Sequence, residues 1–271
     1  MNGIILCEGE TDQILLSKYF GCQYGFQYEG NCHLNEHNEH NEHNVHIHGC
    51  EYKNGSGNFL QIAYVEGKNN FADALEYILW VNRLNAGKFF DYIAVVMDHD
   101  SDEEVLAVNR KLQNVLAQAC LDGEEMNFGW SSYRMKDVSF QDKRDIWDVR
   151  FILITLPIEE NGALETFLLH SLAEKAENKY LVQQSEHFVE EIISMSNKGI
   201  STKKEAKIFP AGLLQSRRLQ IKAPLAVYFG VLNPERIFGK FEKVLNSVNW
   251  NQYRTVQNGL KAFDVVLNAK K

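Results

Sequence analysis

Residues 92–102 read YIAVVMDHDSD, an apolar run that stops at two aspartates. An unbroken apolar run such as Tyr92–Met97 is typical of a strand that is buried on both faces of a parallel sheet. Asp98-His99-Asp100 ends this strand, and alternate side chains along a strand point to the same side. Both carboxylates can therefore reach one cation, and hard oxygen ligands favour Mg²⁺ or Mn²⁺.

These acids also suit a purely structural role, that of capping a helix. Aspartates in loops after strands commonly cap the following helix, and Asp102 and Asp12 are suited to that role. An isolated Asp-x-Asp motif does not decide between a ligand and a cap. Glu8 strengthens the ligand interpretation because it follows a second apolar run, Ile4–Cys7. The carboxyl ends of neighbouring parallel strands meet at one edge of the sheet, where α/β proteins bind their ligands.

Further apolar runs alternate with stretches of helical periodicity. The predicted strands are Ile4–Cys7, Phe59–Val65, Tyr92–Met97 and Phe151–Leu156. The first predicted helix begins at Asp12, with Thr11 as its cap, and the second runs from Phe71 to about Leu84. The third, which Asp102 caps, runs to about Leu121, and the fourth begins near Ala163. Residues 122–148 lack a clear period. The remainder is predicted to be mostly helical, with breaks at Pro210, Pro224 and Pro234.

This order of elements predicts an α/β protein with a parallel sheet covered by helices on both faces. We expect a single domain over residues 1–271, with a helical and basic carboxyl-terminal part at 178–271 packed on the core. Residues 21–58 are predicted to be an inserted loop, because they hold six of the nine histidines and the repeat EHNEHNEHN at 36–44.

Composition excludes several classes of protein. The chain has 271 residues, of which 45% are hydrophobic and 24% charged, which suits a folded protein rather than a disordered one. No apolar run reaches the ~18 residues of a membrane-spanning helix, and the start, MNGIILCEGE, lacks the basic region of a signal peptide. The five cysteines are scattered, which favours a reducing compartment. We therefore expect a cytoplasmic protein with no membrane partner.

The net charge of −8 conceals an asymmetry. Residues 1–200 carry 15 Lys and Arg against 32 Asp and Glu, whereas residues 201–271 carry 13 against 4. The basic end is expected to face something acidic: a nucleic acid, a phosphate-bearing substrate or the acidic part of its own chain. The charge of the whole chain argues against simple non-specific DNA binding.

Several motifs resemble a known family. The run Glu8-Gly9-Glu10-Thr11-Asp12 is similar to the first motif of the Toprim (topoisomerase–primase) domain, and Asp98-His99-Asp100 resembles its Asp-x-Asp motif. Residues 164–168, LETFL, are similar to a segment of the OLD-type nucleases and of small stand-alone Toprim-like proteins. Residues 202–207, TKKEAK, resemble the region where those proteins place a lysine. The resemblance implies a Toprim-like sheet flanked by helices.

The same resemblance implies a role for each matched residue. Glu8 would be the general acid or base, or a metal ligand, and Lys207 or else Lys204 would neutralise charge on the transferring phosphate. Asp98 and Asp100 would hold the principal Mg²⁺ or Mn²⁺. The implied metal-binding residues are Glu8, Asp12, Asp98, Asp100, Asp102 and Glu165.

The expected function is metal-dependent phosphoryl transfer, which depends mainly on positioning and charge neutralisation. The resemblance implies a nuclease that acts on nucleic acid with a partner, such as a separate ATPase or another protein, in defence against foreign DNA. Two alternatives remain: a catalytically idle module that binds nucleic acid or protein, and a nucleotide phosphohydrolase. The intact set of acids favours an enzyme over the idle module.

Other side chains offer weaker candidates. The histidines of the repeat recur every third residue and could bind Zn²⁺ or Ni²⁺ on a helix, but the asparagines and flanking glycines favour a loop without a specific metal. His99 is expected to be exposed to solvent. The mixed aromatic and charged residues of 130–148 suit either single-stranded nucleic acid or a solvated surface. Arg217, Arg218 and Lys222 either line the far side of the acidic cleft or lie on an ordinary helix surface.

Overall fold

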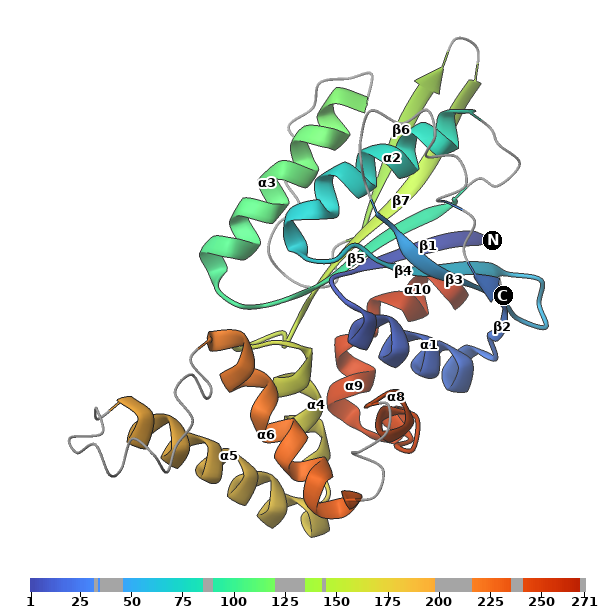
Figure 1. The fold of residues 1–271 in the computed structure, drawn as a ribbon. Coiled ribbons are helices and arrows are strands. Elements are labelled where there is room, and N and C mark those ends of the chain that lie inside the picture. Colours follow the sequence, from blue (N-terminus) through green and yellow to red (C-terminus); the bar gives the residue numbers. More distant parts are fainter. Residues whose placement is uncertain are drawn as a thin grey trace.

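A seven-stranded sheet lies between two layers of helices, and a helical part lies beyond one end of it (Figure 1). The structure is a computed structural model that describes residues 1–31, 34, 46–84, 90–119, 135–142, 145–197, 216–234 and 241–268. The histidine-rich repeat at 36–44, Lys204 and Lys207 lie outside these ranges. None of the described helices is long and apolar enough to cross a membrane.

The strand order in the sheet is β2-β3-β4-β1-β5-β7-β6. The four central strands, β4, β1, β5 and β7, are mutually parallel, as the buried apolar runs predict. Antiparallel pairs at both edges make the whole sheet mixed. The strands are β1 (Asn2–Cys7), β2 (Gln27–Asn31), β3 (His48–Lys53), β4 (Phe59–Tyr64), β5 (Tyr92–Asp98), β6 (Met135–Asp142) and β7 (Asp145–Leu156). The predicted α/β fold is therefore confirmed.

The edge strands were not predicted. β2 and β3 lie in the segment 21–58, which we expected to be a loop, and β3 pairs along its whole length with β4. β6 and the start of β7 lie in residues 122–148, where no period is visible. An edge hairpin exposes polar residues, as the ion pair between Arg150 and Asp137 illustrates at 2.7 Å. Its sequence therefore lacks the apolar run that identifies a central strand.

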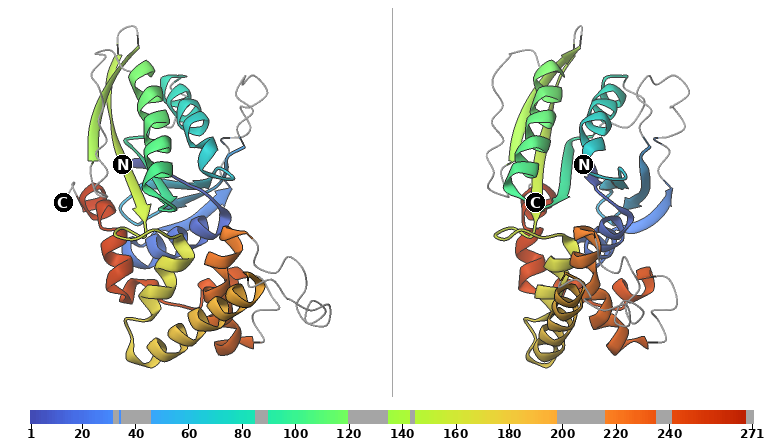
Figure 2. Two further views of the ribbon diagram at one scale, coloured as in Figure 1. Left: turned by 90° about the vertical axis from the view of Figure 1, so that its left-hand side faces the viewer. Right: turned by 60° about the vertical axis from the view of Figure 1, so that its left-hand side comes forward.

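The helices form two layers and an end group. Figure 1 shows α2 (Phe71–Leu84) and α3 (Asp102–Ala119) on one face of the sheet, and α1 (Glu10–Tyr24) and α10 (Ala262–Asn268) on the other. In Figure 2, α4, α5 and α6 gather beyond the carboxyl end of β7. The end group and its neighbours comprise α4 (Leu164–Leu172), α5 (Ala176–Asn197), α6 (Arg217–Leu232), α8 (Phe241–Leu245), η4 (Trp250–Gln252) and α9 (Arg254–Gly259).

Three helix boundaries or breaks differ from the prediction. α1 begins at Glu10 because the carboxylate of Asp12 accepts a hydrogen bond from the backbone of Gly9 at 2.8 Å, so Thr11 is not the cap. α3 begins at Asp102, and the hydroxyl of Ser101 accepts from the backbone of Glu104 at 3.3 Å. Pro224 lies inside α6 and does not end it. Each cap therefore lies before the residue that we expected.

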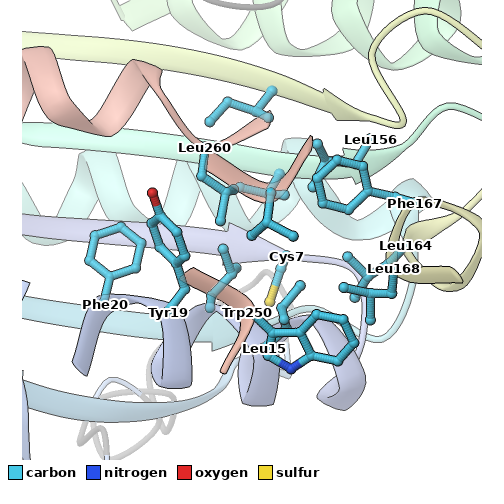
Figure 3. Packing of buried hydrophobic residues seen from close by; sticks show 14 of the residues in the cluster. Cys7, Leu15, Tyr19, Phe20, Leu156, Leu164, Phe167, Leu168, Trp250 and Leu260 are labelled. Carbon is cyan, nitrogen blue, oxygen red and sulfur yellow. The ribbon is translucent and has the colours of Figure 1, made fainter. Parts of the chain in front are cut away.

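The core on the α1 side of the sheet joins the carboxyl-terminal helices to the strands. Figure 3 shows Cys7 of β1 and Leu156 of β7 packed with Phe167 of α4 and Leu260 after α9. The approach is close at Gly259, where an added Cβ would lie 2.6 Å from the Phe167 ring. The apolar cluster thus fixes α4 and α9 against the carboxyl end of the parallel strands.

Candidate functional site

A pocket of about 650 Å³ opens where the carboxyl ends of β1, β4 and β5 meet. Side chains from these strand ends line it, together with the first turns of α1 and α4 and a residue pair from α6. The lining residues with ionisable side chains are Glu8, Glu10, Asp12, Tyr64, Glu66, Lys68, Asp98, Asp100, Glu104, Glu165 and Lys222. The pocket therefore lies at the edge where parallel α/β sheets bind ligands.

Glu8, Asp12 and Asp98 form the inner part of the pocket, and backbone groups fix their carboxylates. Glu8 Oε1 accepts a hydrogen bond from the backbone nitrogen of Asp98 at 3.2 Å. Asp98 Oδ1 accepts one from the first residue of α4, Leu164, at 2.9 Å. Asp12 Oδ2 accepts from Gly9. The motifs on β1 and β5 are thus joined to each other and to α4.

The carboxylates of Asp12 and Asp98 resist ionisation. Burial raises the pKa of Asp98 well above its ordinary value, and the negative charges of Asp12 and Glu8 raise it further. Burial likewise raises the pKa of Asp12 to about 7, with smaller contributions from Glu8 and Glu165, although the hydrogen bond from Gly9 acts in the opposite direction. Carboxylates that share a poorly solvated space repel one another, and a nearby positive charge would relieve this repulsion.

Asp100 and Glu165 also line the pocket, and each has a lysine partner. The ammonium of Lys68 lies 2.6 Å from Asp100 Oδ2 and also contacts Glu104. Lys222 of α6 pairs with Glu165, whose side chain is only 6% exposed. The two lysines come from segments far apart in the sequence, the turn η2 (Lys68–Asn70) and α6. Both lysines therefore place positive charge among the acids that line the pocket.

The loop between β4 and α2 carries Lys68 to the pocket in a constrained backbone conformation. Gly67 donates its backbone N–H to the carbonyl of Glu8 at 3.0 Å, which ties the loop to the end of β1. Glu66 adopts φ 57° and Gly67 adopts φ 116°. A left-handed conformation is uncommon for a glutamate and often accompanies functional loops.

The structure brings most of the predicted site residues together. Glu8, Asp12, Asp98, Asp100 and Glu165 all line the same pocket. Asp102 does not line it: its side chain is 88% exposed, and its carboxylate oxygen accepts a hydrogen bond from Nε2 of the His99 ring across 2.9 Å. At the first position of α3, Asp102 is directed toward His99 rather than toward the strand end.

His99 also differs from its prediction. Its side chain is only 15% exposed, and Nδ1 lies 3.1 Å from the carbonyl of Pro157. Together with a backbone bridge to Gly162, this contact links β5 to the loop before α4. His99 thus holds the loop that leads into α4, whose second residue is Glu165.

Sequence reasoning missed Lys68, Glu104 and Tyr64. A signal was present for Lys68, because it follows the predicted strand Phe59–Val65 closely and so lies near the sheet edge where the acids are expected. Lys222, for which we left two interpretations open, lines the pocket and pairs with Glu165. The side chains of Arg217 and Arg218 lie outside the described part of the chain.

The pocket has the donor chemistry of a site for hard divalent cations, because its inner acids offer only carboxylate oxygens. Among the described residues, no group of three or more His, Cys, Asp or Glu side chains stands arranged so that it could hold a metal ion. The lysine contacts of Asp100 and Glu165 take up oxygens that a cation would otherwise use. Cation binding would require these side chains to change partners.

Fold and pocket define the class: an α/β protein with an acidic pocket at the carboxyl edge of its parallel strands. The chain belongs to the family described as "Protein of unknown function (DUF3226)", whose model matches residues 2–214. No protein with a curated description matches it. The chain is similar to the crystal structure of hypothetical protein PH0156 from Pyrococcus horikoshii OT3, with 19% identity over 88% of this chain and 99% of that chain and a TM-score of 0.40.

Proposed function

We propose that this chain is a Toprim-like phosphoryl-transfer enzyme that uses Mg²⁺ or Mn²⁺, and that it acts as a nuclease together with a partner. The observation that carries the proposal is the electrostatics of the pocket. Among the described residues, eight carboxylates and two lysines line it. A phosphate cannot enter such a pocket without additional positive charge, and divalent cations supply that charge in enzymes that act on phosphodiesters.

The residues that would hold the cations follow from burial and charge. Asp98 and Asp12 gain most from a cation, because burial and mutual repulsion raise the pKa of both. Glu8 lies directly beside them through its hydrogen bond to the backbone of Asp98. Asp100 and Glu165 complete the set once their lysines move away. A bound cation would supply charge neutralisation and an activated water.

The two lysines suit the charge of a substrate phosphate. When Asp100 and Glu165 turn toward cations, Lys222 loses its carboxylate partner and Lys68 keeps only Glu104. Each can then contact a phosphate oxygen, which is the role that the resemblance assigns to Lys207 or Lys204. Lys207 remains a prediction because it lies outside the described residues. The basic balance of residues 201–271 supports a polymeric anion as substrate.

The test is Mn²⁺-dependent cleavage of single- and double-stranded DNA and RNA by the wild type and four variants. Asp98→Asn should abolish cleavage. Lys222→Gln should lower kcat by about 100- to 1000-fold, as loss of an oxyanion donor does, and Lys207→Gln is compared with it directly. Asp102→Asn is the matched control, since its exposed carboxylate does not line the pocket. Cleavage that survives Asp98→Asn would refute the proposal.

A second candidate is the idle binding module. Lys68 pairs with Asp100 and Lys222 pairs with Glu165, so both carboxylates have a positive partner without any metal. An idle binding module would need such an arrangement. The absence of a Mn²⁺-dependent rise in melting temperature, together with no cleavage, would favour the idle module.

A nucleotide phosphohydrolase is the third candidate, because a pocket of about 650 Å³ has the size of a small-molecule site. Hydrolysis of mononucleotides but not polymers would favour it.

A further inference from the structure

A row of stacked rings leads out of the acidic pocket. Tyr64, the last residue of β4, lines the pocket. His48 lies opposite it in the β3–β4 register and stacks on it, with ring centroids 5.0 Å apart and planes inclined by 21°. His46 stacks on His48 at 6.4 Å and 17°. The aromatic row therefore begins at the pocket wall and continues through the first residue of β3 to His46, which precedes that strand.

The Tyr64 ring is held close to the acidic centre. Tyr64 is paired with Cys7, the last residue of β1, across the parallel β1–β4 ladder, and Glu8 directly follows Cys7. His48 supports the ring from the neighbouring strand, and an ion pair of 3.2 Å to Glu66 holds His48 in turn. A ring supported in this way can offer a flat surface at low entropic cost.

The charges around Tyr64 restrict what can lie on it. Burial and the nearby carboxylates of Glu10 and Glu66 raise the pKa of the Tyr64 hydroxyl, so this wall of the pocket is negative. These carboxylates repel a phosphate, whereas Lys68 and Lys222, which also line the pocket, attract it. A flat ligand group without negative charge therefore suits the Tyr64 ring. A nucleobase meets both conditions, and its amino groups can donate hydrogen bonds to the flanking carboxylates.

We propose that Tyr64, backed by His48, is a stacking platform for one unpaired nucleobase beside the phosphate that enters the acidic pocket. This proposal rests on the proposed function and specifies its substrate as a nucleotide unit whose base is free to leave a duplex. Base stacking on an aromatic ring tolerates any base, so the platform selects single-stranded over paired nucleic acid rather than one sequence.

The test measures binding with Ca²⁺ in place of Mn²⁺, by fluorescence anisotropy of labelled probes on the full chain. The first probe is a single-stranded oligodeoxynucleotide, and the second is the same length of abasic backbone. Tyr64→Leu should weaken binding of the first by roughly 5- to 100-fold and leave the second unchanged. Tyr64→Phe should keep wild-type affinity for both. Tyr180→Leu removes another exposed tyrosine, on α5, and is the control.

Titration with adenosine monophosphate and with ribose 5-phosphate separates this proposal from the nuclease proposal. A preference of the wild type for adenosine monophosphate that Tyr64→Leu removes would support the platform even if no polymer is bound or cut. Equal binding of base-bearing and abasic ligands by the wild type would overturn it, even if Asp98-dependent cleavage is observed. Equal weakening of both ligands by Tyr64→Leu, or no binding of any probe, would also overturn it.

Discussion

Asp98 Oδ1 lies 2.9 Å from the backbone nitrogen of Leu164, so one carboxylate both faces the acidic pocket and binds the first residue of α4. A negative group at a helix N-terminus is favourable, which gives Asp98 a structural role beside its proposed role in catalysis. The contact also keeps Glu165, the next residue, at the pocket wall. Variants of Asp98 must therefore separate these two roles.

Asp98→Asn and Asp98→Ala provide that separation. The asparagine keeps an oxygen acceptor for Leu164, whereas alanine leaves the N–H without this partner, at a cost of about 1–3 kcal/mol. We expect Asp98→Ala to be less stable than Asp98→Asn in urea unfolding, while both lose Mn²⁺-dependent cleavage. Mn²⁺ should raise the melting temperature of the wild type more than that of either variant. Equal stability of the two variants would contradict the role of this hydrogen bond.

Asp12 should make the metal-free protein less stable as the pH rises. Its pKa is about 7 in the folded chain, whereas an unfolded chain leaves an aspartate near 4. The folded state therefore binds the proton more tightly between these values, and its free energy of unfolding falls as the pH increases from about 4 to 7. At pH 8, Asp12→Asn should be more stable than the wild type by at most about 4 kcal/mol.

The measurement for Asp12 is urea unfolding in EDTA from pH 4 to pH 8, expressed as the difference between variant and wild type. That difference in the free energy of unfolding should be near zero at pH 4 and should increase between about pH 4 and pH 7. Glu103→Gln, which removes an exposed acid of α3, controls for the loss of one surface charge. A difference that is constant with pH would show that Asp12 ionises normally.

Lys222 should stabilise the fold through Glu165. The glutamate side chain is 6% exposed, so removing its partner leaves a nearly buried carboxylate alone. We expect Lys222→Met to lower the free energy of unfolding by about 3–5 kcal/mol at most, and the double variant with Glu165→Gln to recover most of this loss. A double-mutant cycle in urea measures the coupling. Additive single effects would mean that the pair does not contribute.

Gly259→Ala tests how tightly α9 packs on α4. An added methyl group would lie 2.6 Å from the Phe167 ring and 3.1 Å from a methyl of Leu156, so the core must move. We expect a loss of about 1–3 kcal/mol. Gly30→Ala is the matched control, because no atom lies within 4 Å of the added group. Equal stability of the two variants would show that α9 can shift away from α4 at little cost in free energy.

The central strands and their acids could be read from the sequence because burial on both faces leaves an unbroken apolar run. Tyr92–Met97 and Ile4–Cys7 show such runs, and each is followed by a polar strand end. The edge strands β2, β3 and β6 leave no comparable run because polar side chains face solvent there. The shared location of Glu8, Asp98 and Asp100 could be predicted because all three follow parallel strands, whose carboxyl ends meet at one edge of the sheet.

The remainder of the site depended on tertiary contacts. Nothing local in the sequence places Lys222 beside Glu165, which precedes it by 57 residues. Tyr64 looks like any strand residue until its neighbour His48 is known. Asp102 shows the reverse: its spacing suits a ligand set, but the start of α3 directs it to His99. Spacing along the chain predicts the edge of the sheet, not the direction of each side chain.

The distance in sequence between Glu165 and Lys222 also bears on how the chain is made. Chains emerge from the ribosome amino end first, and domains tend to fold in that order. Every carboxylate of the pocket is present once residue 165 has been made, but Lys222 follows only later. A nascent chain that ends between these residues has an acidic wall without this counter-charge. We therefore expect α4 to dock only after α6 has been synthesised, so that the pocket closes as a late event in biosynthesis.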